Sequence, residues 1–343
     1  MASPAIEYYS RSAALTGYAE LARSLGLDPL RILAAAGVSA QALTDPDLKI
    51  PGRAVARVLE TSAERSGAED FGLRLSEQRR LSNMGVLGLV VRDQPNLRRV
   101  VEVFAQYNWI QTEAVSVVLE EAGEHAVVRL VLARGGGRAS RQSTELCVGV
   151  LCRTLAVIAG PRWRPQLACF THGPPARPTC HRRVLGVAAV FDQEFDGVMF
   201  PRADLDADIP AADPVMADQA ARFADLTRRE RPRRATDRVR ELVTLLLPTG
   251  QATVERIAGH LGVDRRTIAR RLAAEGTDFS AILDGVRIEL AQSYVDGGDR
   301  PLTDIADILG FSALSAFSRW HVQWFGESPT ARRKRREAAL VRA

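Results

Sequence analysis

The chain has 343 residues, of which 46% are apolar and 25% are charged. This composition is typical of an ordinary folded protein, and the length predicts two or three domains. The most apolar run, 146–160, is too short to cross a bilayer and contains Arg153, which argues against an integral membrane protein.

Targeting signals are also absent from the start of the sequence. Residues 1–12 lack the basic start, apolar run and cleavage site of a signal peptide. We therefore expect a cytoplasmic protein with no membrane partner. Its four cysteines, Cys147, Cys152, Cys169 and Cys180, would be reduced there.

The positive charge is concentrated toward the end of the sequence. The net charge is +5, but residues 228–343 hold 21 basic and 15 acidic side chains, whereas residues 1–227 hold 25 and 26. This asymmetry indicates a polyanionic partner for the last third. A merely solvated basic surface fits the charge count equally well.

In chain order, the first part has a mixed pattern. Residues 15–110 have helical spacing, with one helix ending at Gly26 and the next starting at Asp28-Pro29. The further helices expected are 51–65, 97–110, 140–158 and 213–226. The strands expected are 115–119, 126–132, 167–171, 188–191 and 197–200, the first two forming a hairpin about Gly123.

These elements predict an α+β domain over residues 1–227, with helices first and a small sheet later. The charged segment 228–235 contains a proline and reads as a linker. Residues 236–343 have only helical patterns and predict a separate all-α domain.

The strongest motif is TVERIAGHLGVDRRTIARRLAAEG, residues 253–276. Thr253 can cap a short helix, Gly262 allows a tight turn, and Asp264 can cap a second helix whose outer face is basic. This order is typical of a helix-turn-helix, in which the second helix reads the major groove. An ordinary packed helix pair is the alternative.

A second copy follows over residues 303–325. Ile305, Ala306 and Leu309 match the first helix of the motif, Gly310 lies in the turn, and 312–325 supplies another recognition helix. Residues 279–295 between the copies form an apolar-striped helix about 25 Å long. Such a helix could hold two reading heads about 34 Å apart, one turn of DNA.

Residues 236–336 resemble the DNA-binding module of the AraC/XylS family. The phrases that carry the resemblance are RRTIARRLAAEGTDFSAILDGVRIELAQSYV, IADILGFSALSAFSRW and WFGESPT. The resemblance implies two recognition helices in successive major grooves of double-stranded DNA, RNA polymerase as a partner, and regulation of transcription, either as an activator or as a repressor. The DNA-binding residues it implies are Arg265, Arg266, Thr267, Ala269 and Arg270 in the first helix and Leu314, Ser315, Ser318 and Arg319 in the second.

Arginine suits this role because its guanidinium can donate two hydrogen bonds to guanine, while hydroxyl groups can hold phosphates or base edges. For Arg270, Arg271 and Arg287, pairing with a nearby carboxylate is the alternative. The chain departs from the family at His321, where an apolar aromatic is usual, and at Arg332, where a tyrosine is usual. His321 is expected to lie partly in the core near Trp320 and Phe325. The basic tail 332–336 could bind phosphates or remain solvated.

Residues 17–210 resemble the effector domain of the same family, called arabinose-binding-like. The phrases are ARSLGLDPLRILAAAG, EDFGLRLSEQRRLSNMGVLGLVVRDQPNLRRVVEVFAQY, AGPRWRPQ and HRRVLGVAAVFDQEFDGVMFP. We expect this domain to bind an apolar or amphipathic small molecule or to mediate self-association into a homodimer.

No catalytic residue, cofactor or metal site is expected, because the cysteines and histidines lack the spacing of metal ligands. The sequence therefore predicts a transcriptional regulator that is not an enzyme. Two alternatives stay open. One is a DNA-binding regulator switched by a protein partner, and the other is an enzyme that carries a DNA-binding module and a metal-held reactive cysteine.

Overall fold

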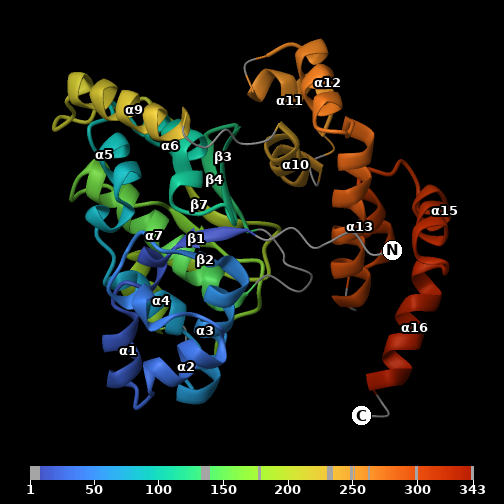
Figure 1. Cartoon of the computed structure of the whole chain (residues 1–343), viewed down its shortest axis with the longest axis horizontal. Helices are drawn as coiled ribbons and strands as arrows, with labels where there is room; N and C mark the ends of the chain where they lie inside the picture. Colours follow the sequence, from blue (N-terminus) through green and yellow to red (C-terminus); the bar gives the residue numbers. More distant parts are fainter. Residues whose placement is uncertain are drawn as a thin grey trace. The chain divides into compact units, whose positions relative to one another are not determined.

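The computed structural model describes residues 8–132, 140–176, 179–229, 235–247, 250, 252–261, 263–297 and 300–340. These residues form two compact units, one with the described residues up to 229 and one that begins at residue 235 (Figure 1). The first unit is an α+β domain, and the described residues of the second are helical outside their turns. The predicted fold class is therefore confirmed.

The first unit combines short helices with two sheets. Its helices are α1 (Tyr18–Ser24), α2 (Pro29–Ala35), α3 (Gly52–Ser66), α4 (Phe71–Glu77), α5 (Val86–Arg92), α6 (Leu97–Tyr107), α7 (Arg141–Ala159), α8 (Thr179–Leu185) and α9 (Pro214–Arg229). Its strands are β1 (Tyr9–Arg11), β2 (Lys49–Pro51), β3 (Val115–Ala122), β4 (His125–Leu132), β5 (Leu167–Cys169), β6 (Ala188–Val190) and β7 (Asp196–Pro201). The larger sheet has the order β3-β4-β7-β5-β6, and only β5 and β6 are parallel.

The expected start and stop signals act as the sequence indicates. The Asp28 carboxylate accepts hydrogen bonds from the Leu30 and Arg31 amides at 3.0 and 3.2 Å and so caps α2. Gly123 has φ +58° in the tight turn between β3 and β4. The β1–β2 ribbon is not predicted by the sequence, because strands of three residues are too short to show an alternating pattern.

Helix α7 runs through the unit and joins its two hydrophobic cores. Leu146 packs with α1–α3, whereas Leu151 and Leu155 pack with the larger sheet and with α5 and α6. In Figure 1, α1–α4 gather at one end of the unit and α5, α6 and α9 at the other. By length and composition α7 could cross a membrane, but 61% of it is buried inside the unit, as in a core helix.

Helices α4 and α7 approach each other very closely because glycine faces backbone. A Cβ atom on Gly72 would lie 2.0 Å from the carbonyl oxygen of Gln142. The Gly72 amide donates to the side-chain oxygen of Gln142 at 2.8 Å, which fixes the start of α7 against α4. Glycine is required here for packing.

The second unit is all-helical over its described residues. Its helices are α10 (Ala235–Leu246), α11 (Val254–His260), α12 (Arg265–Ala274), α13 (Phe279–Gly297), α14 (Leu302–Ile308), α15 (Leu314–Phe325) and α16 (Pro329–Leu340). The long helix α13 spans about 28 Å at 1.5 Å per residue. Ile282, Val286 and Leu290 form its buried stripe, while Phe279 and Leu283, which we also expected there, are only half-buried.

The first helix of this unit is tied to the end of α12. The Glu275 carboxylate accepts hydrogen bonds from the Ala235 amide at 2.6 Å and from the Thr236 amide and hydroxyl at 2.8 and 2.6 Å. Of the expected linker 228–235, residues 228–229 close α9 and Ala235 begins α10. Residues 230–234 lie outside the described residues.

Candidate nucleic-acid interface

Helices α11 and α12 form the first helix-turn-helix. The Thr253 hydroxyl accepts from the Arg256 amide at 3.3 Å, and the Asp264 carboxylate accepts from the Thr267 amide at 2.7 Å. Both side chains are therefore the caps that the sequence indicates. Ile257, Ile268 and Leu272 are buried between the helices. Gly262, expected in the turn, lies outside the described residues.

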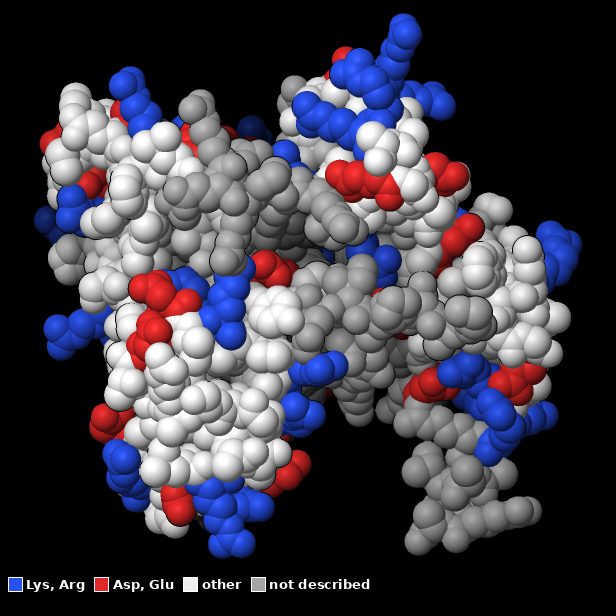
Figure 2. Space-filling view, viewed as in Figure 1, with Lys and Arg blue, Asp and Glu red and all other residues white. Residues whose placement is uncertain are grey.

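The outer face of α12 carries two exposed arginines. At 100° per residue, Arg266 and Arg270 lie roughly 140° and 180° from the buried stripe of Ile268 and Leu272. Neither has a hydrogen bond or ion pair with any residue in the described ranges. Figure 2 shows Lys and Arg side chains gathered over α11 and α12. Arg270 is therefore not paired with a carboxylate of the described residues, which was the alternative to DNA binding.

The other candidate residues of α12 are arranged differently. Arg265 pairs with Glu255 at 3.1 Å, although both side chains remain mostly exposed. The Thr267 hydroxyl donates to Asp264 at 2.9 Å and so reinforces the cap. Ala269 is exposed beside Arg266 and Arg270, and its small side chain would let DNA come close to α12.

Helices α14 and α15 repeat the arrangement with a longer turn. Ile305, Ala306 and Leu309 are buried, and Gly310 has φ +71° in the turn. Three residues, 311–313, separate Gly310 from α15, whereas two residues, 263–264, separate position 262 from α12. Ala313 stands where Asp264 caps the first helix, so α15 begins without a side-chain cap.

The face of α15 matches that of α12 residue for residue. Phe317 and His321 take the buried places of Ile268 and Leu272, so Ser315 and Arg319 take the outer places of Arg266 and Arg270. Both are exposed, and Arg319 has no polar partner within the described ranges. Leu314 is 37% exposed, and Ser318 is half-buried at the edge of this face.

His321 lies in the core and is fully buried, more deeply than the partial burial that the sequence predicts. Its Nδ1 lies 2.7 Å from the Glu327 carbonyl oxygen, whereas its Nε2 is buried with no partner in the described part of the chain. The ring packs 4.4 Å from Phe325. Trp320 packs against Phe311 and Phe317. Burial lowers the pKa of His321, which favours the neutral ring.

Two arginines that the sequence left open have structural partners. Arg332 donates twice to Asp296 at 2.8 Å and lies 4.9 Å above the Phe325 ring, which joins α16 to α13. Arg287 donates to the Leu309 carbonyl at 3.0 Å, lies 4.6 Å from the Phe311 ring, and pairs with Asp284 at 3.7 Å. The pairing interpretation of Arg287 is thus confirmed. Arg332, which we expected in a phosphate-binding or solvated tail, is instead half-buried between α13 and α16.

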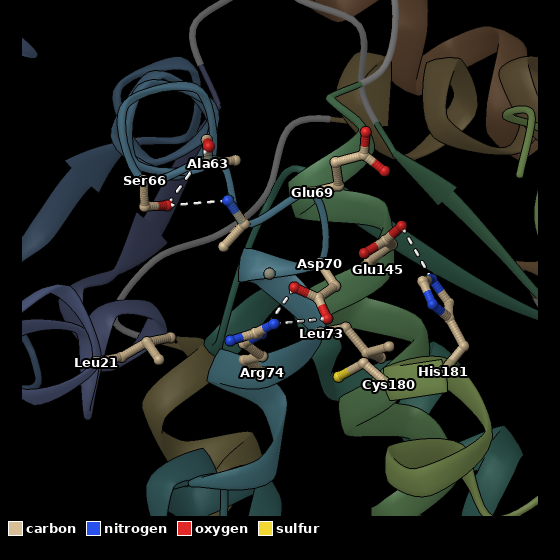
Figure 3. Close-up of polar contacts among 12 residues, drawn as sticks. Leu21, Ala63, Ser66, Glu69, Asp70, Leu73, Arg74, Glu145, Cys180 and His181 are labelled. Atoms are coloured by element: carbon tan, nitrogen blue, oxygen red, sulfur yellow. Dashed lines mark hydrogen bonds and ion pairs between the residues drawn. The ribbon is translucent and has the colours of Figure 1, made fainter. Parts of the chain in front are cut away.

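The cysteines of the first unit are buried or half-buried. All four cysteines are free thiols, and no three His, Cys, Asp or Glu side chains in the described ranges are grouped as metal ligands. Burial raises the pKa of Cys152 to about 12, and burial together with Asp70 raises that of Cys180 to about 11. Figure 3 shows Cys180 near the ion pair of Asp70 and Arg74. These cysteines are therefore protonated thiols near neutral pH.

The fold and this surface define a DNA-binding protein with two helix-turn-helix motifs joined by a long helix. Residues 26–209 match the family described as the arabinose-binding domain of AraC transcription regulators, and residues 257–335 match a helix-turn-helix domain. Because the first match covers more than half of the chain, the protein belongs to the AraC family of transcription regulators.

Several relatives cover nearly the whole chain. The HTH-type transcriptional regulator VirS of Mycobacterium tuberculosis is 28% identical over 93% of this chain and 94% of its own. The ornithine utilization regulator of Pseudomonas aeruginosa is 26% identical over 91% and 92%. The crystal structure of the transcriptional regulator CdpR from Pseudomonas aeruginosa covers 91% of this chain and 97% of its own, with a TM-score of 0.45 and 18% identity.

Proposed function

We propose that this regulator reads its operator mainly through Arg266 and Arg270 of α12, with α15 as a second head, and that a small molecule bound to the first unit controls this binding. The observation that carries the proposal is the outer face of α12. Two exposed arginines one turn apart have no partner in the described residues, while Ile268 and Leu272 anchor the opposite face.

The second head contributes less discrimination in this proposal. At the places of Arg266 and Arg270, α15 presents Ser315 and Arg319, so it has one guanidinium where α12 has two. Ser315 and the uncapped amides at the start of α15 suit phosphate oxygens, which position a protein without specifying sequence. Leu314 and Ser318 flank this face, and Arg265, Thr267 and Ala269 flank the face of α12.

The test is binding to a randomised operator library at two salt concentrations. Arg266→Ala and Arg270→Ala should each weaken operator binding by about 1–3 kcal/mol and relax base preference at one or two positions. Arg319→Ala should have a smaller effect. Arg271→Ala is the matched control, because this exposed arginine lies on the flank of the same helix and should leave base preference unchanged.

Phosphate contacts should behave differently from base contacts. Lys334 is exposed on α16, whereas its neighbour Arg332 is held by Asp296. Lys334→Ala should therefore weaken binding to all sequences alike and reduce the salt dependence. The proposed division of labour is wrong if Arg319→Ala changes base preference more than either arginine of α12.

Control by an effector is proposed because the first unit is a compact domain that matches the arabinose-binding family. A relative named as an ornithine utilization regulator supports response to a metabolite. RNA polymerase, a homodimer and a cytoplasmic location are proposed from the family. A switch by a protein partner is the second candidate. Ligand-dependent melting of the purified chain separates the two, since a bound effector raises the melting temperature.

A further inference from the structure

A buried polar cluster lies at the start of α7 in the first unit. It consists of Arg141 and Glu145 on α7, His172 after β5, and His181 on α8, and we call it the polar box. The side chains of Glu145 and His181 are 0 and 1% exposed, whereas those of His172 and Arg141 are 15 and 28% exposed and reach the surface. Figure 3 shows Glu145 and His181 facing each other.

The hydrogen bonds of the polar box fall on one side of its carboxylate. Glu145 Oε1 lies 3.0 Å from Arg141 Nε, 3.1 Å from His181 Nε2 and 3.5 Å from His172 Nε2. Glu145 Oε2 is buried with no partner within the described ranges, and so is Arg141 Nη2. The ion pair is therefore single-pronged, and the second prong of each side chain is enclosed and unused. A buried polar atom without a partner is unfavourable, because it has lost its hydrogen bonds to water without a replacement.

The histidines of the box add further unused acceptors. His172 Nδ1 lies 2.9 Å from the Gly173 carbonyl and donates to it. Burial lowers the pKa of His172, so its ring is neutral and Nε2 carries a lone pair directed at Glu145. His181 donates through Nε2 to Glu145, which leaves the buried Nδ1 as an acceptor without a partner. Two acceptors thus face each other across 3.5 Å with no hydrogen between them.

The polar box has charged prongs of both signs and an aromatic wall. Arg141 offers a donor, while Glu145 and His172 offer acceptors, and the charges of Arg141 and Glu145 balance. The Phe170 ring lies 5.1 Å from His172 and 5.7 Å from His181, and Phe191 stacks on Phe170 at 5.5 Å. A cation is attracted to such ring faces, and a carbon chain packs against them.

We propose that the polar box is the effector site and that it takes a zwitterion of the amino-acid class. The ligand's ammonium donates to Glu145 Oε2 and His172 Nε2, and its carboxylate accepts from Arg141 Nη2. Such a ligand pairs both unused prongs without adding net charge to a buried site. Charge-assisted hydrogen bonds are about twice as strong as neutral ones, which favours a zwitterion over a polyol. This identification rests on the proposed effector control of the first unit.

The experiment uses the full-length protein and its melting temperature. The twenty standard L-amino acids are tested singly, with L-arabinose as a neutral polyol, and any amino acid that binds is compared with its amine-only and carboxylate-only analogues. We expect at least one amino acid to raise the melting temperature and both analogues to fail. Glu145→Gln should weaken that binding at least tenfold, and so should Arg141→Lys, which keeps the charge but lacks the second prong.

The matched control is Glu69→Gln. Glu69 is an exposed neighbour that accepts from the Ala176 amide through its carboxylate, and its replacement should leave amino-acid binding unchanged. Retention of operator DNA by each variant, measured in parallel, shows that the variant is folded and tests the proposed DNA reading separately. Arg141→Lys alters a partly exposed side chain, so it remains informative if Glu145→Gln fails to fold.

Three outcomes overturn the assignment. One is that no amino acid shifts the melting temperature, and the buried prongs are then satisfied by structural water only. Another is a shift that is equal in wild type and Glu145→Gln, which leaves effector control intact but places the site elsewhere. The third is a shift by L-arabinose alone that Glu145→Gln abolishes, which makes the ligand a polyol.

Discussion

Replacing His321 with phenylalanine tests how the second reading head is held together. The change removes the hydrogen bond from Nδ1 to the Glu327 carbonyl, which contributes about 0.5–1.5 kcal/mol. It also removes the buried, unpartnered Nε2, whose desolvation is unfavourable by about 1–3 kcal/mol. The ring already packs against Phe325 and Phe317, so an apolar ring fits the site chemically. We expect His321→Phe to be neutral or to stabilise this head by about 1 kcal/mol at pH 7.5.

The difference should grow in acid. The pKa of His321 is lowered by burial, so its protonation is less favourable in the folded state than in the unfolded state. The contribution of neutral His321 to the stability of the wild type is therefore fully present above the unfolded pKa, near 6.5. This contribution is lost as the pH falls through the lower folded pKa. The phenylalanine variant lacks this loss. Below pH 6.5 its advantage should increase.

Hydrogen exchange of the α15 amides, read by mass spectrometry on the full chain, measures the opening of this head separately from the first unit. His321→Asn is the matched variant. Its amide can still donate toward the Glu327 carbonyl but does not fill the ring's volume, so this variant should be less stable than wild type at pH 7.5. Like the phenylalanine variant, it should lack the acid-dependent loss of stability. The reasoning is refuted if His321→Phe loses more than about 1.5 kcal/mol at pH 7.5, or if its stability depends on pH as the wild type's does.

Three further predictions concern other parts of the chain. Gly72→Ala should destabilise the first unit by about 1–3 kcal/mol in a thermal melt, because its Cβ would overlap the Gln142 carbonyl, whereas Gly259→Ala on α11 has open space and should be neutral or stabilising. Asp264→Ala should lower both the melting temperature and operator affinity by uncapping α12, and Asp264→Asn, which can still cap, should do so less. Cys152 and Cys180 should resist iodoacetamide at pH 7.5 until urea unfolds the chain, because their pKa values are about 12 and about 11; fast labelling of the native protein would support the reactive-cysteine alternative.

The parts of the fold that the sequence predicted are those set by local chemistry. Asp28, Thr253 and Asp264 cap the helices they precede, because a cap depends on amides two or three residues away. The buried stripes of both motifs follow from helical periodicity, which is also local. This is why the two reading heads could be located before their packing was known.

The parts that the sequence did not predict depend on distant partners. Arg332 looked like a solvated or phosphate-binding tail residue, but its partner Asp296 is 36 positions away and only the packing of α13 against α16 brings them together. The residues of the polar box come from α7, α8 and the segment after β5, so no regular spacing in the sequence predicts the cluster. The hydrogen-bond partner of His321 is the backbone carbonyl of Glu327. Every residue has such a carbonyl, so the amino-acid sequence cannot predict this contact.

The hydrogen bonds of Glu275 have a mechanical consequence. They fasten the first two residues of α10, where the described chain resumes after residue 229, to the residue that ends α12. Helix α10 also packs against α12 and α13, and its Val239 and Val243 are buried, so the Glu275 carboxylate adds a polar link to an apolar one. Because α12 carries Arg266 and Arg270, loss of the Glu275 carboxylate would loosen α10 from the helix that holds both arginines.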